Sequence, residues 1–224
     1  MNRNRRVFRA ARTAALIFLS AVVLTGCVDV VQYVSGSGST IDVYLRLTLQ
    51  KSAFEMANSM SPDPQELDEM FDDEFELDRE TVLEELPPGI DATYEMVNDE
   101  FEYGFELSYS ASRDALARAS GTEEGAFVPR IDRQGMTIPL AEGGGNGQEP
   151  DPQSDQFANA FLGGAKYRVF ISRRLVSRVS SARLVFDDRS TEVTVIELPD
   201  VWMVQFPVSL WLMSGETPSI EIIY

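Results

Sequence analysis

The sequence predicts an α+β fold in which antiparallel β-hairpins form a sheet and several short helices are grouped between them. Two pairs of segments alternate apolar and polar residues, capped helical stripes lie between these pairs, and the C-terminal third is rich in strand patterns. Because hairpins and helices come in separate runs and do not alternate one by one, the order favours antiparallel strands over parallel ones.

The first hairpin is expected at residues 28–34 and 41–49, joined by a turn of glycine and serine. Apolar residues take every second position from Ile41 to Leu49, and polar residues take the positions between them. Successive side chains of a strand point to opposite faces, so this hairpin is expected to bury one face and expose the other.

Three short helices are expected next. Ser52-Ala-Phe-Glu55 and Asp63-Pro-Gln-Glu66 fit the pattern of a capped helix start, and the second has proline at the favoured first helical position. A third helix begins at Asp78 and ends at Pro87-Pro88-Gly89. A second hairpin at residues 92–109 follows, in which aromatic and acidic residues alternate.

The chain then continues with a short helix at Arg113–Ala119 and a strand within 126–140. Residues 141–153 are rich in glycine, proline and polar residues, which predicts a flexible loop. A helix at 154–161 follows it. Since the part after this loop is too short to bury much surface alone, residues 27–224 are expected to form a single domain. Six strands are expected after the last helix: 166–172, 182–186, 191–198, 201–206, 208–212 and 220–224.

The N-terminus has the layout of a secretory signal. Five arginines and no acidic residue occupy the first twelve positions, and an apolar stretch at 14–24 follows them. A stable transmembrane helix needs about 20 apolar residues, so this shorter stretch favours a removable signal peptide over a permanent membrane-spanning anchor.

Leu24-Thr25-Gly26-Cys27 resembles the lipobox of bacterial lipoproteins. The resemblance implies that residues 1–26 are the signal peptide, that the Cys27 thiol receives a diacylglyceryl group, and that Cys27 becomes the first residue of the mature chain. Its new amino group is then a further site for an acyl chain such as palmitate. Acyl chains contribute about 0.8 kcal/mol per buried methylene, which holds a protein on a membrane without a spanning helix.

Two further features concern export and sorting. Arg5-Arg6 and the residues after them partly resemble a twin-arginine motif, but the preceding Ser or Thr and the Leu after Phe8 are missing, so general secretion is expected. Val28 follows the cysteine. In lipoproteins similar to those of enteric bacteria, aspartate at this position signals inner-membrane retention, so the outer membrane is favoured in a cell that has one.

Composition excludes several chemistries. The chain has no histidine, and Cys27 is its only cysteine, so zinc sites of the usual type, Cys–His catalysis and Ser-His-Asp triads are excluded. Removal of the leader leaves 14 basic against 36 acidic residues, a net charge of −22, which repels nucleic acid. No catalytic residue, metal site or cofactor is predicted.

Charged and aromatic clusters leave alternatives open. The acidic block at 63–106 holds half of all acidic residues, and Asp72, Asp73, Glu74, Glu76 and Asp78 have the oxygen ligands that Ca²⁺ prefers, although a solvated face is the expected use. The aromatic stripes at 101–109 and 202–206 either line a lipid-binding cavity or, as expected, belong to the core. A basic cluster either binds lipid phosphates or anionic polysaccharide or, as expected, neutralises the acidic block: Arg168, Arg173, Arg174, Arg178, Arg183 and Arg189.

The order of elements and the segment Tyr167-Arg-Val-Phe-Ile-Ser172 loosely resemble the exported domain of LppM-type envelope lipoproteins, which are implicated in envelope lipid handling. The resemblance carries no site motif. Together these features predict a non-enzymatic, membrane-anchored envelope lipoprotein that binds a lipid-like or apolar ligand or has a structural role. The alternative is an interaction module whose acidic face binds a basic partner protein or Ca²⁺. A hydrolase with two carboxylates is a third hypothesis, which rests only on the abundance of acids.

Overall fold

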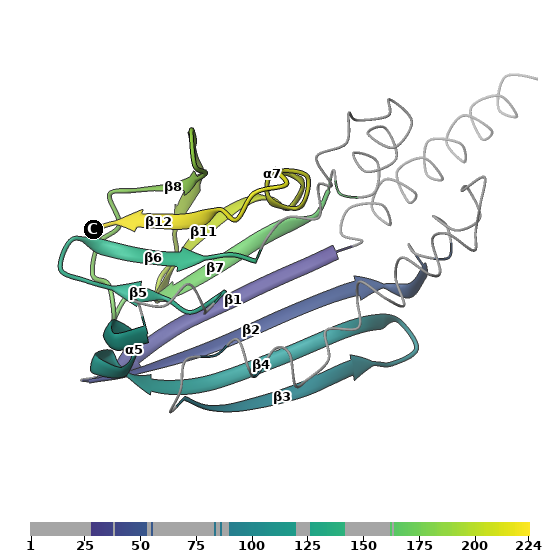
Figure 1. Cartoon of the computed structure of the whole chain (residues 1–224), viewed down its shortest axis with the longest axis horizontal. Coiled ribbons are helices and arrows are strands. Elements are labelled where there is room, and N and C mark those ends of the chain that lie inside the picture. Colours follow the sequence, from purple (N-terminus) through teal and green to yellow (C-terminus); the bar gives the residue numbers. More distant parts are fainter. Residues whose placement is uncertain are drawn as a thin grey trace, which may run out of the picture.

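The computed structural model describes residues 28–37, 39–52, 55, 83, 86, 90–119, 126–141, 162 and 164–224. In this part of the chain, twelve strands form two sheets, and two short helices accompany them (Figure 1). Strand residues account for 59% and helical residues for 10%. The protein is therefore β-rich, and the predicted α+β fold with several helices is wrong.

The larger sheet has the strand order β10-β11-β7-β1-β2-β4-β3. Its central strand, β1, pairs in parallel with β7, whereas every other pair in the sheet is antiparallel. The parallel pair joins the N-terminal hairpin to the C-terminal third of the chain. The bounds of these strands are β1 (Val28–Ser37), β2 (Thr40–Gln50), β3 (Asp91–Asn98), β4 (Glu102–Ser112), β7 (Lys166–Ser172), β10 (Thr194–Glu197) and β11 (Val201–Pro207).

The smaller sheet has the order β5-β6-β12-β8-β9 and is antiparallel throughout. In Figure 1 it lies over β1, β7 and β11, while β2, β4 and β3 extend beyond it. Each sheet covers an apolar face of the other, so this part of the core needs no helical layer, which explains the error in fold class. The bounds are β5 (Arg130–Ile131), β6 (Gly135–Pro139), β8 (Ser181–Val185), β9 (Ser190–Glu192) and β12 (Ser219–Ile223).

The individual elements match the sequence patterns more closely than the fold class does. Both expected hairpins form, as β1–β2 and β3–β4, and α5 (Arg113–Ala119) lies at the predicted residues. The segment expected as a strand at 208–212 is instead helix α7 (Ser209–Leu212), because β11 ends at Pro207, which has no backbone N–H to continue the sheet. The helices expected over 52–89 and at 154–161, and the loop at 142–153, lie outside the described residues, apart from isolated positions.

One close approach between strands requires glycine. Gly104 in β4 has φ +158°, and a Cβ built on it would lie 2.0 Å from the backbone oxygen of Leu47 in β2. No side chain larger than hydrogen fits between these two strands at this point. The residue therefore allows β2 and β4 to keep an unbroken register along eleven residue pairs.

A buried polar network links the two layers at the middle of β1. The side chain of Gln32 is fully buried between Leu45 and Val169 of the neighbouring strands. Its Oε1 accepts a hydrogen bond from the hydroxyl of Tyr167 at 2.9 Å, and its Nε2 donates to the carbonyl of Phe127 at 2.8 Å. Burial raises the pKa of Tyr167 well above its ordinary value, so this hydroxyl remains a proton donor at all physiological pH values.

We expect Gln32→Leu to lower the free energy of unfolding by about 1–3 kcal/mol, although leucine is the more apolar residue. The substitution leaves the buried hydroxyl of Tyr167 without its acceptor, and urea denaturation measures the cost. Adding Tyr167→Phe removes the orphaned group and restores most of the loss. The matched control is Gln205→Leu on the outer face of β11, and an equal cost for both leucine variants would contradict the role of the network.

Candidate functional site

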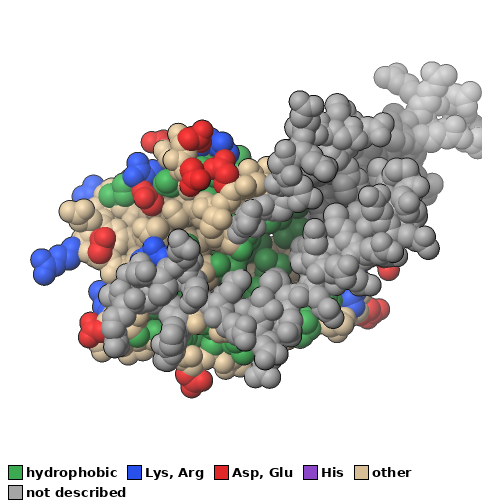
Figure 2. All heavy atoms as spheres, in the orientation of Figure 1, with side chains coloured by type: hydrophobic (Ala, Val, Ile, Leu, Met, Phe, Trp, Pro, Cys, Tyr) green, Lys and Arg blue, Asp and Glu red, His purple; other side chains and the backbone are tan. Residues whose placement is uncertain are grey.

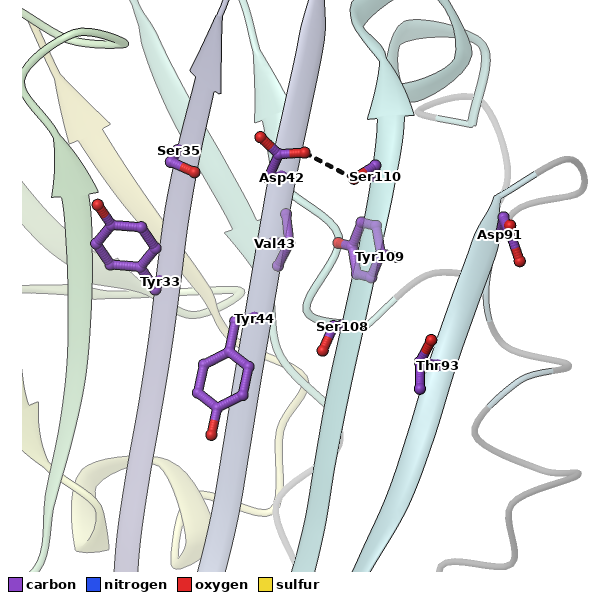
Figure 3. Close-up of a pocket in the computed structure, with 10 residues that line it drawn as sticks. All are labelled: Tyr33, Ser35, Asp42, Val43, Tyr44, Asp91, Thr93, Ser108, Tyr109 and Ser110. Carbon is purple, nitrogen blue, oxygen red and sulfur yellow. Dashed lines mark hydrogen bonds between the residues drawn. The ribbon is translucent and has the colours of Figure 1, made fainter.

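A groove on the outer face of the larger sheet is the strongest candidate for a functional site. Its first part is a depression of about 400 Å³ over β1, β2, β4 and β3 (Figure 3). A second depression of about 700 Å³ shares Tyr33, Ser35 and Asp42 with the first and extends toward the end of β7. Because the two share these lining residues, we treat them as one continuous surface, the outer groove. Its further lining residues include Tyr44, Asp91, Thr93, Ser108, Ser110, Arg173, Arg174 and Asp200.

The strand register arranges the groove residues in two rows. Partners in neighbouring strands lie side by side and share a face of the sheet. One row contains Tyr33 in β1, Tyr44 in β2 and Ser108 in β4. The next row contains Asp42 in β2, Ser110 in β4 and Asp91 in β3. The groove therefore has an aromatic row and a parallel row of oxygen-bearing side chains.

The two tyrosine rings form the apolar part of the groove. Tyr33 is 37% exposed, and in Figure 3 the rings of Tyr33 and Tyr44 are seen face-on, with their hydroxyls pointing in opposite directions along the strands. The same row continues onto Phe170 in β7 and Met203 in β11, which are half-buried. An apolar row thus crosses four adjacent strands on the outer face.

The carboxylate of Asp42 is the best-defined polar group of the site. Its Oδ1 accepts a hydrogen bond from the hydroxyl of Ser110 at 2.6 Å, as the dashed line in Figure 3 marks. Asp91 lies on the other side of Ser110 in the register, so the two carboxylates are separated by an intervening strand. Their arrangement does not give two acids facing each other across a cleft, which a two-carboxylate hydrolase requires.

The far end of the groove carries two arginines with different surroundings. Arg173 pairs with Glu197 at 2.9 Å and lies over the ring of Trp202, with its guanidinium carbon 5.2 Å from the ring centroid. Arg174 is exposed and forms no ion pair with a described carboxylate. Within the described residues of the groove, Arg174 is therefore the cation open to a ligand.

Only some of the residues predicted to be functional lie in the part of the chain that the structure describes. Cys27 and the suggested Ca²⁺ ligands between 72 and 78 lie outside the described residues, and the described part of the chain contains no group of three acidic side chains that could hold a metal ion. It also contains no helix long and apolar enough to cross a membrane. The aromatic stripes belong to the core at most of their positions: Phe105, Tyr109, Trp202 and Phe206 are buried, whereas Tyr103 is half-buried and Phe101 is 69% exposed.

The ion pairs that the structure describes for the basic cluster have partners outside the acidic block. Arg183 pairs with Glu221 at 2.6 Å and Arg189 with Glu216 at 3.0 Å, both over the smaller sheet, where Figure 2 shows acidic and basic side chains close together. Arg168 pairs with Asp29 across β7 and β1. These partners are near in space but lie outside the block at 63–106.

Sequence reasoning missed the outer groove. The signal was present, because Tyr33 and Tyr44 occupy outward-facing positions of a hairpin whose inward-facing positions are apolar apart from Gln32. An aromatic residue at a solvent-facing strand position contributes nothing to the core. Two such residues opposite each other mark a place where an exposed sheet face offers aromatic surface to a ligand.

The environment of Tyr44 gives a direct test of the groove geometry. Partial burial raises the pKa of the Tyr44 phenol, and Glu106 adds to this effect both by accepting its hydrogen bond and by its negative charge. We expect Glu106→Gln to lower the pKa of Tyr44 toward the ordinary value, since an amide accepts a hydrogen bond without the charge. Titration of the tyrosine ring carbons by NMR measures the change. Glu95→Gln, the neighbour of Glu106 on β3, is the control, and an unchanged Tyr44 pKa in Glu106→Gln would contradict the geometry.

Comparison with models of protein families, with curated proteins and with solved structures gave no match to this chain. The two-sheet fold and the outer groove therefore rest on the sequence and geometry of this protein itself. The lipobox, the envelope location and the loose resemblance to LppM-type lipoproteins stay predictions.

Proposed function

We propose that this protein is a non-enzymatic, lipid-anchored envelope protein that binds its ligand in the outer groove of the larger sheet. The observation that carries the proposal is the position of β1. This strand begins at Val28, directly after the predicted acylation site, and it contributes Tyr33 and Ser35 to the groove. The predicted anchor thus directly precedes, in the sequence, a strand that lines the groove.

The distance between anchor and groove follows from strand geometry. A β-strand rises about 3.3 Å per residue, and Tyr33 lies six positions after Cys27, so the two are at most about 20 Å apart along the chain. Val28, the first residue of β1, follows Cys27 directly in the sequence. A ligand of the groove would therefore be held close to the bilayer surface, which suits a component of the envelope itself.

The open form of the groove favours recognition of a ligand on an exposed face over enclosure of a lipid in a cavity. A carrier that shields a lipid needs an enclosed cavity with predominantly apolar walls. The depressions found over the described residues are open to solvent, and oxygen-bearing side chains line most of the first one. We therefore propose recognition on an exposed face in place of enclosure in a lipid cavity.

The remaining parts of the proposal come from the sequence. Export by general secretion, membrane attachment through acyl chains on Cys27 and sorting to the outer membrane, where one exists, follow from the leader and the lipobox. The net charge of −22 expected for the mature chain makes nucleic acid an unfavourable partner.

We expect Cys27→Ser to abolish acylation and to move the protein out of the membrane fraction. Serine has no thiol to receive the diacylglyceryl group, so the processed variant carries no acyl chain and is lost from the membrane after washing with salt and alkali. Fractionation and intact-mass analysis of the parent protein and the variant are the measurements. Ser35→Cys in the Cys27→Ser background is the control, because it restores a thiol without the lipobox. An unmodified Cys27 in the mature parent protein would contradict the anchor.

A further inference from the structure

We infer that the outer groove binds a glycan, with the rings of Tyr33 and Tyr44 stacked on the faces of pyranose rings and the neighbouring carboxylate and hydroxyls bonded to their hydroxyl groups. This inference rests on the proposed function and names the class of ligand for the same site. It follows from the chemistry of the lining residues, from their arrangement in rows, and from the shape of the groove.

The aromatic rings of Tyr33 and Tyr44 are suited to stack on the C–H faces of a sugar ring. A pyranose ring has faces of C–H groups, which carry a slight positive charge, and the face of an aromatic ring carries the negative part of its quadrupole. Tyr33 and Tyr44 are cross-strand partners on the same face of the sheet, and Figure 3 shows both rings face-on, with the ring of Tyr33 beside β1 on the side of β7. They offer a flat apolar platform at the middle of the groove.

The row of Asp42, Ser110 and Asp91 is suited to form hydrogen bonds with the hydroxyl groups at the edge of a sugar ring. Ser110 occupies one acceptor position of the Asp42 carboxylate, and an ionised carboxylate has about four such positions on its two oxygens. Hydrogen bonds from a neutral donor to a charged acceptor are about twice as strong as neutral ones. Thr93, Ser108 and Asp91 continue this supply of oxygen atoms onto β4 and β3.

The lining composition favours a glycan over a protein or a lipid. Val43 and Tyr109 have side chains buried on the inner face, and every other residue that lines the first depression carries a side-chain oxygen, with no basic residue among them. The cores of protein–protein interfaces are depleted in Ser and Asp, and lipid sites are mostly apolar. A dense set of oxygens beside two aromatic rings suits a ligand that has hydroxyls on its edge and C–H groups on its faces.

The shape of the groove favours an oligosaccharide. Both depressions have volumes within the range of about 300–1,000 Å³ that is typical of small-molecule sites, and they share Tyr33, Ser35 and Asp42. A chain of several sugars can therefore extend from β3 across Tyr44 and Tyr33 to the end of β7. The exposed Arg174 at that end fits an acidic sugar at one terminus.

The experiment uses the acylated protein extracted in detergent from its native membrane. The probes are an immobilised array of neutral and acidic pyranose oligosaccharides that includes peptidoglycan fragments. We expect the parent protein to bind members of the array, and the double variant Tyr33→Ala/Tyr44→Ala to lose roughly tenfold or more in affinity because two stacked rings are removed. The double variant Tyr33→Phe/Tyr44→Phe keeps the rings and retains most of the binding.

Phe101→Ala is the matched control, since Phe101 is an exposed aromatic residue outside the groove. Melting temperatures of all variants establish that the fold is intact. Absence of binding to every probe, or equal binding by the parent protein and Tyr33→Ala/Tyr44→Ala, would overturn the inference. Self-association that the double alanine variant abolishes, without glycan binding, would identify the face as a protein interface and would also overturn it.

The outcomes separate this inference from the proposed anchor. Intact-mass analysis of the same preparation reports whether Cys27 is acylated. An acylated protein that binds no glycan would refute the ligand and leave the anchor in place, whereas an unacylated protein that binds glycan through Tyr33 and Tyr44 would refute the anchor alone.

Discussion

The hydrogen-bond network of Gln32 is the constraint on which the rest of the structure depends. A fully buried amide between apolar strands is costly unless both its ends are satisfied, and here Tyr167 donates to one end while Phe127 accepts from the other. Phe127 has φ 64°, an unfavourable value for a residue with a side chain, and its carbonyl also accepts a hydrogen bond from Tyr109 at 3.3 Å. These contacts fix the register of β1 against β7 and the position of the smaller sheet above them.

Fixing the register of β1 also fixes its outer face. Side chains alternate along a strand, so a slip of one residue would place Tyr33 in the core and Gln32 in solvent. With Gln32 held inside, Tyr33 and Ser35 must face outward beside Tyr44 and Asp42. The proposed binding face is therefore a direct consequence of core packing, and it stands on the strand that begins next to the predicted lipid anchor.

Local patterns predicted local structure well. Both hairpins, helix α5 and the core positions of Phe105, Tyr109, Trp202 and Phe206 follow from alternation and caps within short windows of sequence. The parallel pairing of β1 with β7 joins residues more than a hundred positions apart, and no local pattern encodes it. For the same reason the division into two sheets, and with it the β-rich fold class, was not predictable. The outer groove combines the four strands of the two hairpins with the end of β7, so its residues converge only after folding.

Amide hydrogen exchange of the acylated protein tests most directly whether β1, the strand next to the predicted anchor, is the stable centre of the larger sheet. A central strand opens only in global unfolding, whereas edge strands open locally. The account predicts that amides of residues 30–35 exchange as slowly as those of β7, and far more slowly than those of the edge strands β3 and β10. Exchange of residues 30–35 at the rate of an edge strand would contradict it.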